Sequence, residues 1–300
     1  MGNLIIDFNI KVIKTKNSYS LSHNIIQLHN NDIAYCIYKN SISIIDPFTL
    51  DIKYSLQELN STITCIVEMD NSTIISGSED SLIIIWKIKE KQYIPYFYIT
   101  GHKESVSNIR VISNNRFISS SDNTIKIWKG IEPYVLIKTI KIECDYVYYY
   151  NDNFYDYLLT ASKANSKLII WSMNSYQQLT TFLDIGGLSY NSYIKINNRK
   201  ILLGNQFCLI VMNMKNISIE KRIIDDLFGK IFCFTNIRNN QVLIGCERGN
   251  MFLLDNSFHY GSINSKAHLD DIFEIIAIDD NTLISISKDR TLKLWKINHS

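Results

Sequence analysis

The stretch that decides the fold runs from residue 101 to residue 128 and reads GHKESVSNIRVISNNRFISSSDNTIKIW. It contains a Gly-His pair, an apolar strand, a turn rich in Ser and Asn, a second strand, an aspartate and a third strand that ends in Trp128. The same order returns near the end of the chain, where His268 is followed by two apolar strands, Asp289 and Trp295. Two copies of one pattern indicate a repeat, and the repeat length then decides the architecture.

The repeat has a period close to 42 residues. Tryptophans close the third strand of four units, and an apolar residue takes the same place in three weaker copies. In chain order these positions are Ile45, Trp86, Trp128, Trp171, Met212, Leu254 and Trp295. Successive intervals are 41, 42, 43, 41, 42 and 41 residues. Seven such units use the whole chain, so we expect one domain over residues 1–300, without an accessory domain.

Each unit also has the pattern of four short strands. In the second unit these are residues 62–68, 74–78, 82–88 and 93–100, and turn residues separate them. The third strands are nearly continuous runs of Ile, Leu and Val, which favours strands that are buried on both faces. Helical periodicity is absent, so an α-helical solenoid of similar repeat length is disfavoured.

Composition narrows the functional class without naming a function. The chain is 46% hydrophobic and 20% charged, with a net charge of +2, so it has no overall attraction to nucleic acid or acidic ligands. Its six cysteines form no Cys-x-x-Cys pair, and its six histidines show no metal-binding spacing. No secretory signal or membrane-spanning run is visible. We therefore expect an intracellular, cytoplasmic protein, with a nuclear location left open, and neither a metal nor a cofactor.

The tryptophan pattern resembles the WD-repeat family of β-propellers. In that family a Gly-His pair, an Asp in the turn after the second strand and a closing Trp-Asp pair mark each repeat. The spacing covers nearly the whole chain, but only two units carry the full set of His, Asp and Trp. The matching positions are His102, Asp122 and Trp128, then His268, Asp289 and Trp295, and, without the His, Asp80 and Trp86. The resemblance implies an all-β, seven-bladed β-propeller of four-stranded antiparallel blades.

This chain departs from the family pattern in two ways. The Asp that follows Trp is replaced by Lys87, Lys129, Ser172 and Lys296. The fifth unit, residues 204–214, keeps only the apolar pattern.

The resemblance also implies a structural network inside each blade. The family's His reaches the Asp of the tight turn, together with a Ser or Thr of the second strand and the indole N–H. Here that would join His102, Asp122 and Trp128 through Ser119 or Ser120, and a similar group recurs at His268, Ser287 and Asp289. A buried polar group without a partner costs about 1–3 kcal/mol, so we expect His102→Ala and Asp122→Ala to be destabilising and non-additive.

A propeller must also close, and the last unit lacks its outer strand. Only residues 296–300 follow Trp295, whereas residues 4–15, LIIDFNIKVIKT, have strand character and no place in the first unit. We expect this N-terminal segment to supply the outer strand of the last blade and so to remove an open sheet edge.

The chemistry-bearing residues favour structural roles over catalysis. A grouping of His, Ser and Asp that repeats at equivalent positions is typical of a repeat fold, not of two catalytic triads. The Asp pairs at 225–226, 270–271 and 279–280 are expected to be solvated loop charges. Lys11, Lys14 and Lys16 alternate along one strand, as do Lys87, Lys89 and Lys91. Exposed lysines also protect sheet edges, so nucleic-acid binding is disfavoured.

These observations predict a non-enzymatic scaffold that binds other proteins or peptides through loops on one propeller face, and that is monomeric on its own. In the family that face carries the loops before the first strand and the turns after the second. The candidate residues are Glu79, Lys103, Glu104, Ser105, Ser121, Asp270, Asp271 and Lys288.

Three alternatives remain open. The chain could be a recognition subunit of a ubiquitin ligase or of a trafficking or RNA-processing assembly, and, more remotely, a propeller enzyme. The tyrosines between 146 and 157 could belong either to the core or to a recognition surface.

Overall fold

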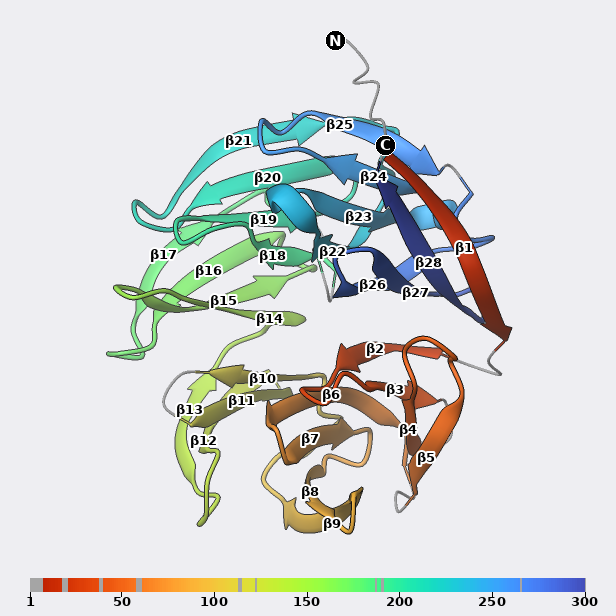
Figure 1. Cartoon of the computed structure of the whole chain (residues 1–300). Helices are drawn as coiled ribbons and strands as arrows, with labels where there is room; N and C mark the ends of the chain where they lie inside the picture. The colour runs from red at the N-terminus through yellow and green to blue at the C-terminus, as the bar shows by residue number, and fades with distance from the viewer. Residues whose placement is uncertain are drawn as a thin grey trace. The chain divides into compact units, whose positions relative to one another are not determined.

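The computed structural model describes residues 8–17, 21–37, 40–57, 61–112, 115–121, 123–186, 188–189, 192–264 and 266–299. These residues form 28 β-strands and two 3₁₀ helices, and the strands make seven four-stranded sheets (Figure 1). Neighbouring strands pair in an antiparallel sense. The chain divides into two compact units: unit 1 is Met1–Leu21, Pro47–Leu50 and Ile185–Ser300, and unit 2 is Ser22–Asp46 and Asp51–Asp184.

Unit 2 holds four sheets, and each uses four consecutive strands in chain order. The strands are β2 (Leu21–Gln27), β3 (Ile33–Ile37), β4 (Ser41–Ile45) and β5 (Ile52–Gln57); β6 (Ile63–Asp70), β7 (Thr73–Ser78), β8 (Ile83–Lys89) and β9 (Gln92–Ile99); β10 (Asn108–Ile112), β11 (Arg116–Ser121), β12 (Thr124–Lys129) and β13 (Leu136–Lys141); and β14 (Tyr146–Asn151), β15 (Asp156–Ser162), β16 (Lys167–Ser172) and β17 (Gln178–Phe182).

Unit 1 holds three sheets, and the last of them takes its fourth strand from the N-terminal segment. The elements are β18 (Tyr193–Lys195), β19 (Lys200–Gly204), β20 (Cys208–Asn213) and β21 (Ser218–Ile224); β22 (Ile231–Asn236), η1 (Arg238–Asn240), β23 (Val242–Cys246), η2 (Glu247–Gly249), β24 (Met251–Leu254) and β25 (Tyr260–Asn264); and β26 (Ile272–Asp279), β27 (Thr282–Ser287), β28 (Thr291–His299) and β1 (Phe8–Asn17).

The two central strands of each sheet form the core. The third strands β8, β20 and β24 contain the continuous apolar runs, and their Ile, Leu, Val and Met residues are buried as the sequence predicts, except Ile88 near the end of β8. The second strands β7, β23 and β27 are buried at every position. In unit 1, apolar side chains of β23 and β24 pack against those of β26 and β27. Full burial of one such side chain contributes about 1.5–3 kcal/mol, so the interior between sheets holds the repeat together.

The tyrosine-rich segment of unit 2 contributes mostly to this core. Tyr148, Tyr150 and Tyr157 are buried, and the rings of Tyr150 and Tyr157 stack with their centroids 6.1 Å apart. The Tyr150 hydroxyl keeps a polar partner by donating to Asp152 over 2.6 Å. Burial therefore accounts for these three tyrosines.

The fifth unit, which keeps only the apolar pattern in the sequence, is a regular sheet of β18 to β21. Its third strand β20 pairs with β19 from Gly204↔Leu209 to Lys200↔Asn213. Met212, the residue that replaces tryptophan, is buried there. An apolar side chain of sufficient size thus fills the tryptophan position without the polar signature.

The N-terminal strand closes the last sheet, as the sequence predicts. β1 pairs antiparallel with β28, from Phe8↔His299 to Asn17↔Thr291, and Figure 1 shows these two strands, far apart in the sequence, side by side. The strand extends past Thr15 to Asn17, whereas residues 4–7 of the expected segment lie outside the described residues.

Two lysines of β1 have a structural role. The Lys14 and Lys16 ammonium groups donate hydrogen bonds to the backbone carbonyls of Thr49 and Leu50, in the turn between β4 and β5. These lysines therefore fasten the N-terminal strand to the segment Pro47–Leu50 of the same unit.

Removal of residues 1–15 should sharply lower the melting temperature, because the deletion exposes the edge of β28 and uncovers the buried Ile297. Ile10→Ala should reproduce part of the loss, about 2–5 kcal/mol in the free energy of unfolding, since Ile10 is buried. The matched control is Ile13→Ala on the same strand, because Ile13 is 56% exposed. Thermal and urea unfolding measure both effects. Unchanged melting of the truncated chain would contradict the role of β1.

Candidate functional site

The last blade contains a continuous chain of buried hydrogen bonds. The Trp295 indole N–H donates to the Ser285 hydroxyl oxygen over 2.7 Å, and the same oxygen lies 2.6 Å from Nε2 of His268. On the other side of the imidazole, Nδ1 lies 2.9 Å from the Asp289 carboxylate and 3.0 Å from the Thr291 hydroxyl. The network therefore links the core of the blade to the turn between β27 and β28.

The charge state of this network follows from burial. Burial lowers the pKa of the His268 imidazole from its ordinary value of 6.5 to about 4, although the neighbouring Asp289 carboxylate acts in the opposite direction. The pKa of Asp289 is also below its ordinary value: burial acts to raise it, but hydrogen bonds from the Thr291 hydroxyl and the Leu269 amide outweigh that effect. At neutral pH the imidazole is neutral. Its Nδ1–H donates to the carboxylate, and Nε2 accepts from the serine hydroxyl.

The order of Ser285, His268 and Asp289 is that of a catalytic triad, but the arrangement cannot act as one. Ser285 and His268 are buried, and the serine oxygen already accepts the indole N–H of Trp295. A nucleophile must reach the substrate, and its general base must be able to take up a proton near neutral pH. Neither condition holds, so the geometry assigns this cluster to structure.

The same contact recurs in three other blades. His102 Nε2 lies 2.7 Å from the Ser119 hydroxyl, which accepts the Trp128 indole N–H over 2.8 Å. Asp122, the predicted acid of that blade, lies outside the described residues. The indoles of Trp86 and Trp171 donate to Ser76 and Thr160 over 2.8 Å and 3.1 Å. Asp80, in the blade without a His, accepts from the Ser78 hydroxyl and the Leu82 amide.

Strand register decides which hydroxyl meets the indole. Each Trp pairs across the ladder with an apolar residue of the second strand, and the hydroxyl sits two residues further along that strand, on the same face. The pairs are Ile74↔Trp86, Phe117↔Trp128, Leu158↔Trp171 and Leu283↔Trp295. The sequence left Ser119 and Ser120 open, and the structure selects Ser119. In the last blade, Ser285 takes the place that the sequence pattern assigned to Ser287.

The serines that do not meet an indole fasten the loops. Ser121 donates to the backbone carbonyl of Glu104 over 2.8 Å, and Ser287 donates to that of Asp270 over 3.0 Å. Both bonds join the end of a second strand to the loop before the first strand of the same blade. Side-chain hydrogen bonds from the second strands therefore hold two of the predicted partner-binding loops, those before β10 and β26.

In unit 1 these loops are also joined to one another. We use the name loop ridge for residues 225–230, 247–250, 267–271 and 287–290. Glu247 N donates to the Lys230 carbonyl over 2.9 Å, Arg248 N to the Asp271 carboxylate over 3.1 Å, and Lys288 N to the Asp271 carbonyl over 2.9 Å. These bonds, two between backbone groups and one to a carboxylate, join the loops of two sheets into one continuous surface.

The loop ridge exposes two leucines among charged side chains. Leu269 is 88% exposed although it directly follows the buried His268. Leu227, which follows Asp226, is 66% exposed. The Arg248 side chain is 84% exposed, and the Lys288 ammonium lies 3.7 Å from both Asp270 and Asp271. Sequence reasoning found Asp270, Asp271 and Lys288 but missed both leucines and Arg248. For the two leucines, the only signal in the sequence that could have found them is an apolar residue within an otherwise polar loop.

The remaining predicted partner-binding residues lie in unit 2. Lys103 and Glu104 are exposed in the loop before β10, and Ser105 is half-buried there. Ser121 is buried at the end of β11, so its side chain supports the loop instead of facing a partner. Glu79 is exposed in the turn between β7 and β8, where its amide donates to the Thr62 carbonyl over 2.9 Å. The structure thus offers Glu79, Lys103 and Glu104 as a second group of accessible loop residues.

Reactive chemistry is limited in the described residues. Burial raises the pKa of the Cys65 thiol to about 11 and that of Cys144 to about 12, so both are protonated at neutral pH. Within the described ranges, no group of three or more His, Cys, Asp or Glu side chains is arranged to hold a metal ion. The same residues include no helix long and apolar enough to cross a membrane.

Comparison with known proteins agrees with this geometry. The family model described as "WD domain, G-beta repeat" (WD40) matches residues 53–87 and 94–129. A crystal structure described as "Crystal Structure of Mitotic Checkpoint Complex" superposes on 99% of this chain and 94% of the other, with a TM-score of 0.81 and 12% sequence identity. Seven four-stranded antiparallel sheets with this likeness define a seven-bladed β-propeller.

Curated relatives point to the same family. The chain is 21% identical over 298 residues to p21-activated protein kinase-interacting protein 1-like of Danio rerio, covering 97% of this chain and 68% of that protein. It is 36% identical over 63 residues to apoptotic protease-activating factor 1 of Rattus norvegicus, which is 21% of this chain but 5% of that protein. Ribosome biogenesis protein YTM1 of Vanderwaltozyma polyspora is 38% identical over 64 residues, 20% of this chain and 13% of that protein. The chain therefore carries WD40 repeats at residues 53–87 and 94–129 and is similar to WD-repeat proteins, within a seven-bladed propeller fold.

The buried histidine makes stability depend on pH in a defined direction. Because the folded pKa of His268 is about 4, below the unfolded 6.5, the unfolded state binds more protons between these values. The free energy of unfolding should therefore fall as the pH drops from 6.5, by roughly 2 kcal/mol at pH 5. His268→Gln should remove this part of the dependence, whereas His259→Gln, whose side chain is 62% exposed, should keep it. Urea unfolding at pH 7 and pH 5 measures the difference. Equal slopes in both variants would contradict the assignment.

The network should also show energetic coupling. His268→Ala and Asp289→Ala each leave a buried partner without its hydrogen bond, so either change alone removes most of the interaction. We expect the double variant to be less destabilised than the sum, with a coupling of about 0.5–3 kcal/mol. The pair His268→Ala with Ile13→Ala serves as the additive control, since Ile13 is exposed on β1. Additive losses in the first pair would argue against a shared network.

Proposed function

We propose that this protein is a non-enzymatic scaffold that binds other proteins or peptides through the loop ridge. The observation that carries the proposal is the exposure of Leu269 and Leu227 on loops that backbone bonds hold in place. Exposed apolar side chains on a rigid, charged surface are the usual centre of a protein interface, because binding then buries them without ordering the loop. Arg248 and the pair of Lys288 with Asp270 supply the polar rim.

The exposure is concentrated on this surface. Among the described large hydrophobic residues, Leu269 at 88%, Ile224 at 72% and Leu227 at 66% are three of the four most exposed, and all three lie in or next to loops that precede a first strand of unit 1. The fourth is Phe154, at 84%, in the turn between β14 and β15. Single exposed apolar residues are ordinary, but their recurrence in the loops before two successive first strands, β22 and β26, supports a recognition role.

A second candidate is a recognition subunit of a larger assembly. The names of two relatives favour it: one is an interacting protein of a p21-activated kinase, and another is a ribosome biogenesis protein. The similar solved structure is also a complex. This reading uses the same loop ridge with a permanent partner, and ubiquitin-ligase, trafficking or RNA-processing assemblies remain its possible settings. A cytoplasmic or nuclear location belongs to the proposal on the same grounds, as does a monomeric state outside such an assembly.

The test is affinity purification of the tagged protein followed by quantitative mass spectrometry, with Leu269→Glu as the variant. A hot-spot residue contributes 2 kcal/mol or more, so the abundance of direct partners should fall by about tenfold or more. Phe154→Glu is the matched control, because Phe154 is equally exposed in a turn that is not part of the loop ridge.

The outcomes separate the two candidates. One partner that co-elutes in size-exclusion chromatography at constant stoichiometry would favour the subunit. Several partners that bind and dissociate independently would favour the scaffold. Identical partner lists for wild type and Leu269→Glu, at equal folding by circular dichroism, would contradict binding at the loop ridge.

A further inference from the structure

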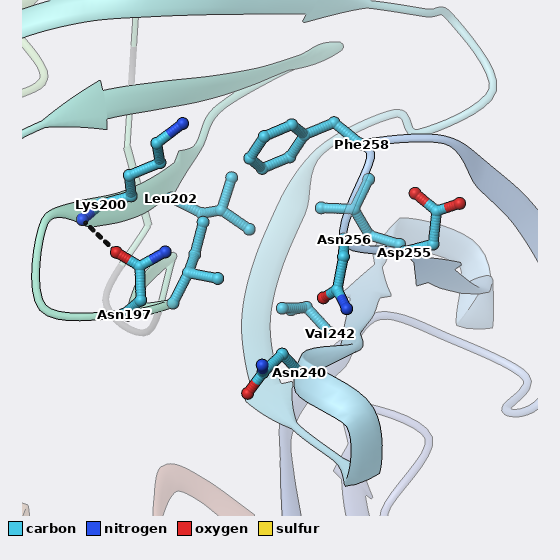
Figure 2. Close-up of a pocket in the computed structure, with 10 residues that line it drawn as sticks. Asn197, Lys200, Leu202, Asn240, Val242, Asp255, Asn256 and Phe258 are labelled. Atoms are coloured by element: carbon cyan, nitrogen blue, oxygen red, sulfur yellow. Dashed lines mark hydrogen bonds between the residues drawn. The ribbon is translucent and has the colours of Figure 1, made fainter.

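A pocket lies at the end of the strands opposite to the loop ridge. The loop ridge uses the turns after second strands and the loops before first strands. The pocket in Figure 2 instead lies among the turn between β18 and β19, the 3₁₀ helix η1 between β22 and β23, and the turn between β24 and β25. Because strands of a sheet alternate in direction, these two sets of connections lie at opposite ends of the strands. A ligand here would not compete with the loop ridge.

The pocket has an apolar floor and a polar mouth. Leu202, Val242 and Leu254 form the buried floor, and the Phe258 ring extends over it from the β24–β25 turn. The polar side chains at the mouth come from three separate turns: Asn197, Lys200, Asn240, Asp255 and Asn256. The volume of about 270 Å³ is slightly below the range of small-molecule sites, about 300–1,000 Å³, and suits a single large side chain.

Local hydrogen bonds preform the mouth. Asn197 Oδ1 accepts the backbone N–H groups of Arg199 and Lys200 over 2.9 and 3.0 Å, so the NH₂ group of its amide is the part that can donate to a ligand. On the other side, Asp255 Oδ1 accepts the N–H groups of Ser257 and His259, both over 2.8 Å. This turn holds Phe258 in the left-handed region, at φ 61°, a conformation that is costly for a bulky residue. The Phe258 ring is therefore placed by the turn before any ligand arrives.

The charge beside the Phe258 ring is positive. The ammonium groups of Lys200 and Lys221 each lie 5.7 Å from the ring centroid. Glu220 compensates Lys200 at 2.7 Å, but among the described residues no carboxylate lies within ion-pair distance of Lys221. The carboxylate of Asp255 is engaged with its own turn and with His259 at 3.4 Å, and Figure 2 shows it directed away from the pocket. An incoming group next to Phe258 thus meets a cation.

From these contacts we infer that the pocket binds a short acidic peptide segment of a partner protein. One bulky apolar side chain of the peptide enters between the floor and Phe258, where burial stabilises it, and flanking carboxylates face Lys221 and Lys200. The Asn amides at the mouth donate to peptide carbonyls. The chemistry selects against basic peptides and polynucleotides, since the first would be repelled by Lys221 and the second would bring no side chain for the apolar floor.

The direct test is methyl NMR on the full chain, with ¹³C-labelled Leu and Val methyl groups and the capped peptide Glu-Glu-Phe-Glu-Glu as probe. We expect saturable shifts at the methyl groups of Leu202, Val242 and Leu254. Glu-Glu-Ala-Glu-Glu lacks the anchor, and Lys-Lys-Phe-Lys-Lys reverses the charge, so both should bind at least about tenfold more weakly. No saturable shift with the first peptide, or equal binding of all three, would overturn the inference. So would tighter binding of the basic peptide or of an oligo-dT strand.

Matched variants separate this pocket from general charge effects and from the loop ridge. Lys221→Glu should weaken the acidic peptide by about fivefold or more, whereas Lys89→Glu, the same charge change at an exposed position of β8, should not. Leu269→Glu should leave peptide binding unchanged. The two proposals can therefore fail separately: loss of partners in Leu269→Glu tests the loop ridge, and loss of peptide binding in Lys221→Glu tests the pocket. An equal loss in Lys221→Glu and Lys89→Glu would show non-specific attraction and overturn the assignment.

Discussion

The structure depends on how a buried indole N–H finds an acceptor. A tryptophan fills the space between sheets with a large apolar surface, but its one polar group cannot remain unpaired there. In four blades a hydroxyl on the neighbouring strand accepts that N–H. In the last blade the hydroxyl then donates to a neutral imidazole, and the imidazole donates to a carboxylate that holds the next turn. One unavoidable donor in the core thereby determines the conformation of a loop at the surface.

This connection explains why the polar signature is recognisable yet dispensable. Where Met212 replaces tryptophan, no indole N–H needs a partner, and the sheet of β18 to β21 forms with an apolar side chain at that position. In the last blade, His268 and Asp289 extend the hydrogen-bond chain from the core to the loop that carries Leu269. The loop so positioned presents Leu269 to solvent, and the turn held by Asp225 presents Leu227. The turns that enclose the Phe258 pocket lie at the other end of the strands.

Much of the architecture could be predicted from the sequence, because apolar side chains at a constant interval have one efficient way to be buried. The third strands and the regular fifth sheet follow from that interval, and the closing role of β1 follows from the strand character of the N-terminal segment. The choice of Ser285 over Ser287 could not be predicted, since both lie on one face of β27 and only the pairing Leu283↔Trp295 distinguishes them. The exposed leucines and the pocket could not be predicted from the sequence either, because they depend on how turns of separate sheets come together.

The pairing of β1 with β28 has a consequence for biosynthesis. During synthesis β1 must wait until β28 has been made before it can pair, because β2 to β27 lie between the two strands in the sequence, and contacts of such long sequence separation form slowly. Throughout that interval β1 presents open backbone groups and the apolar side chain of Ile10, which is the kind of segment that pairs with other nascent chains. Lys11, Lys14 and Lys16 would then act as guards against aggregation during synthesis, before Lys14 and Lys16 take up their carbonyl partners in the finished fold.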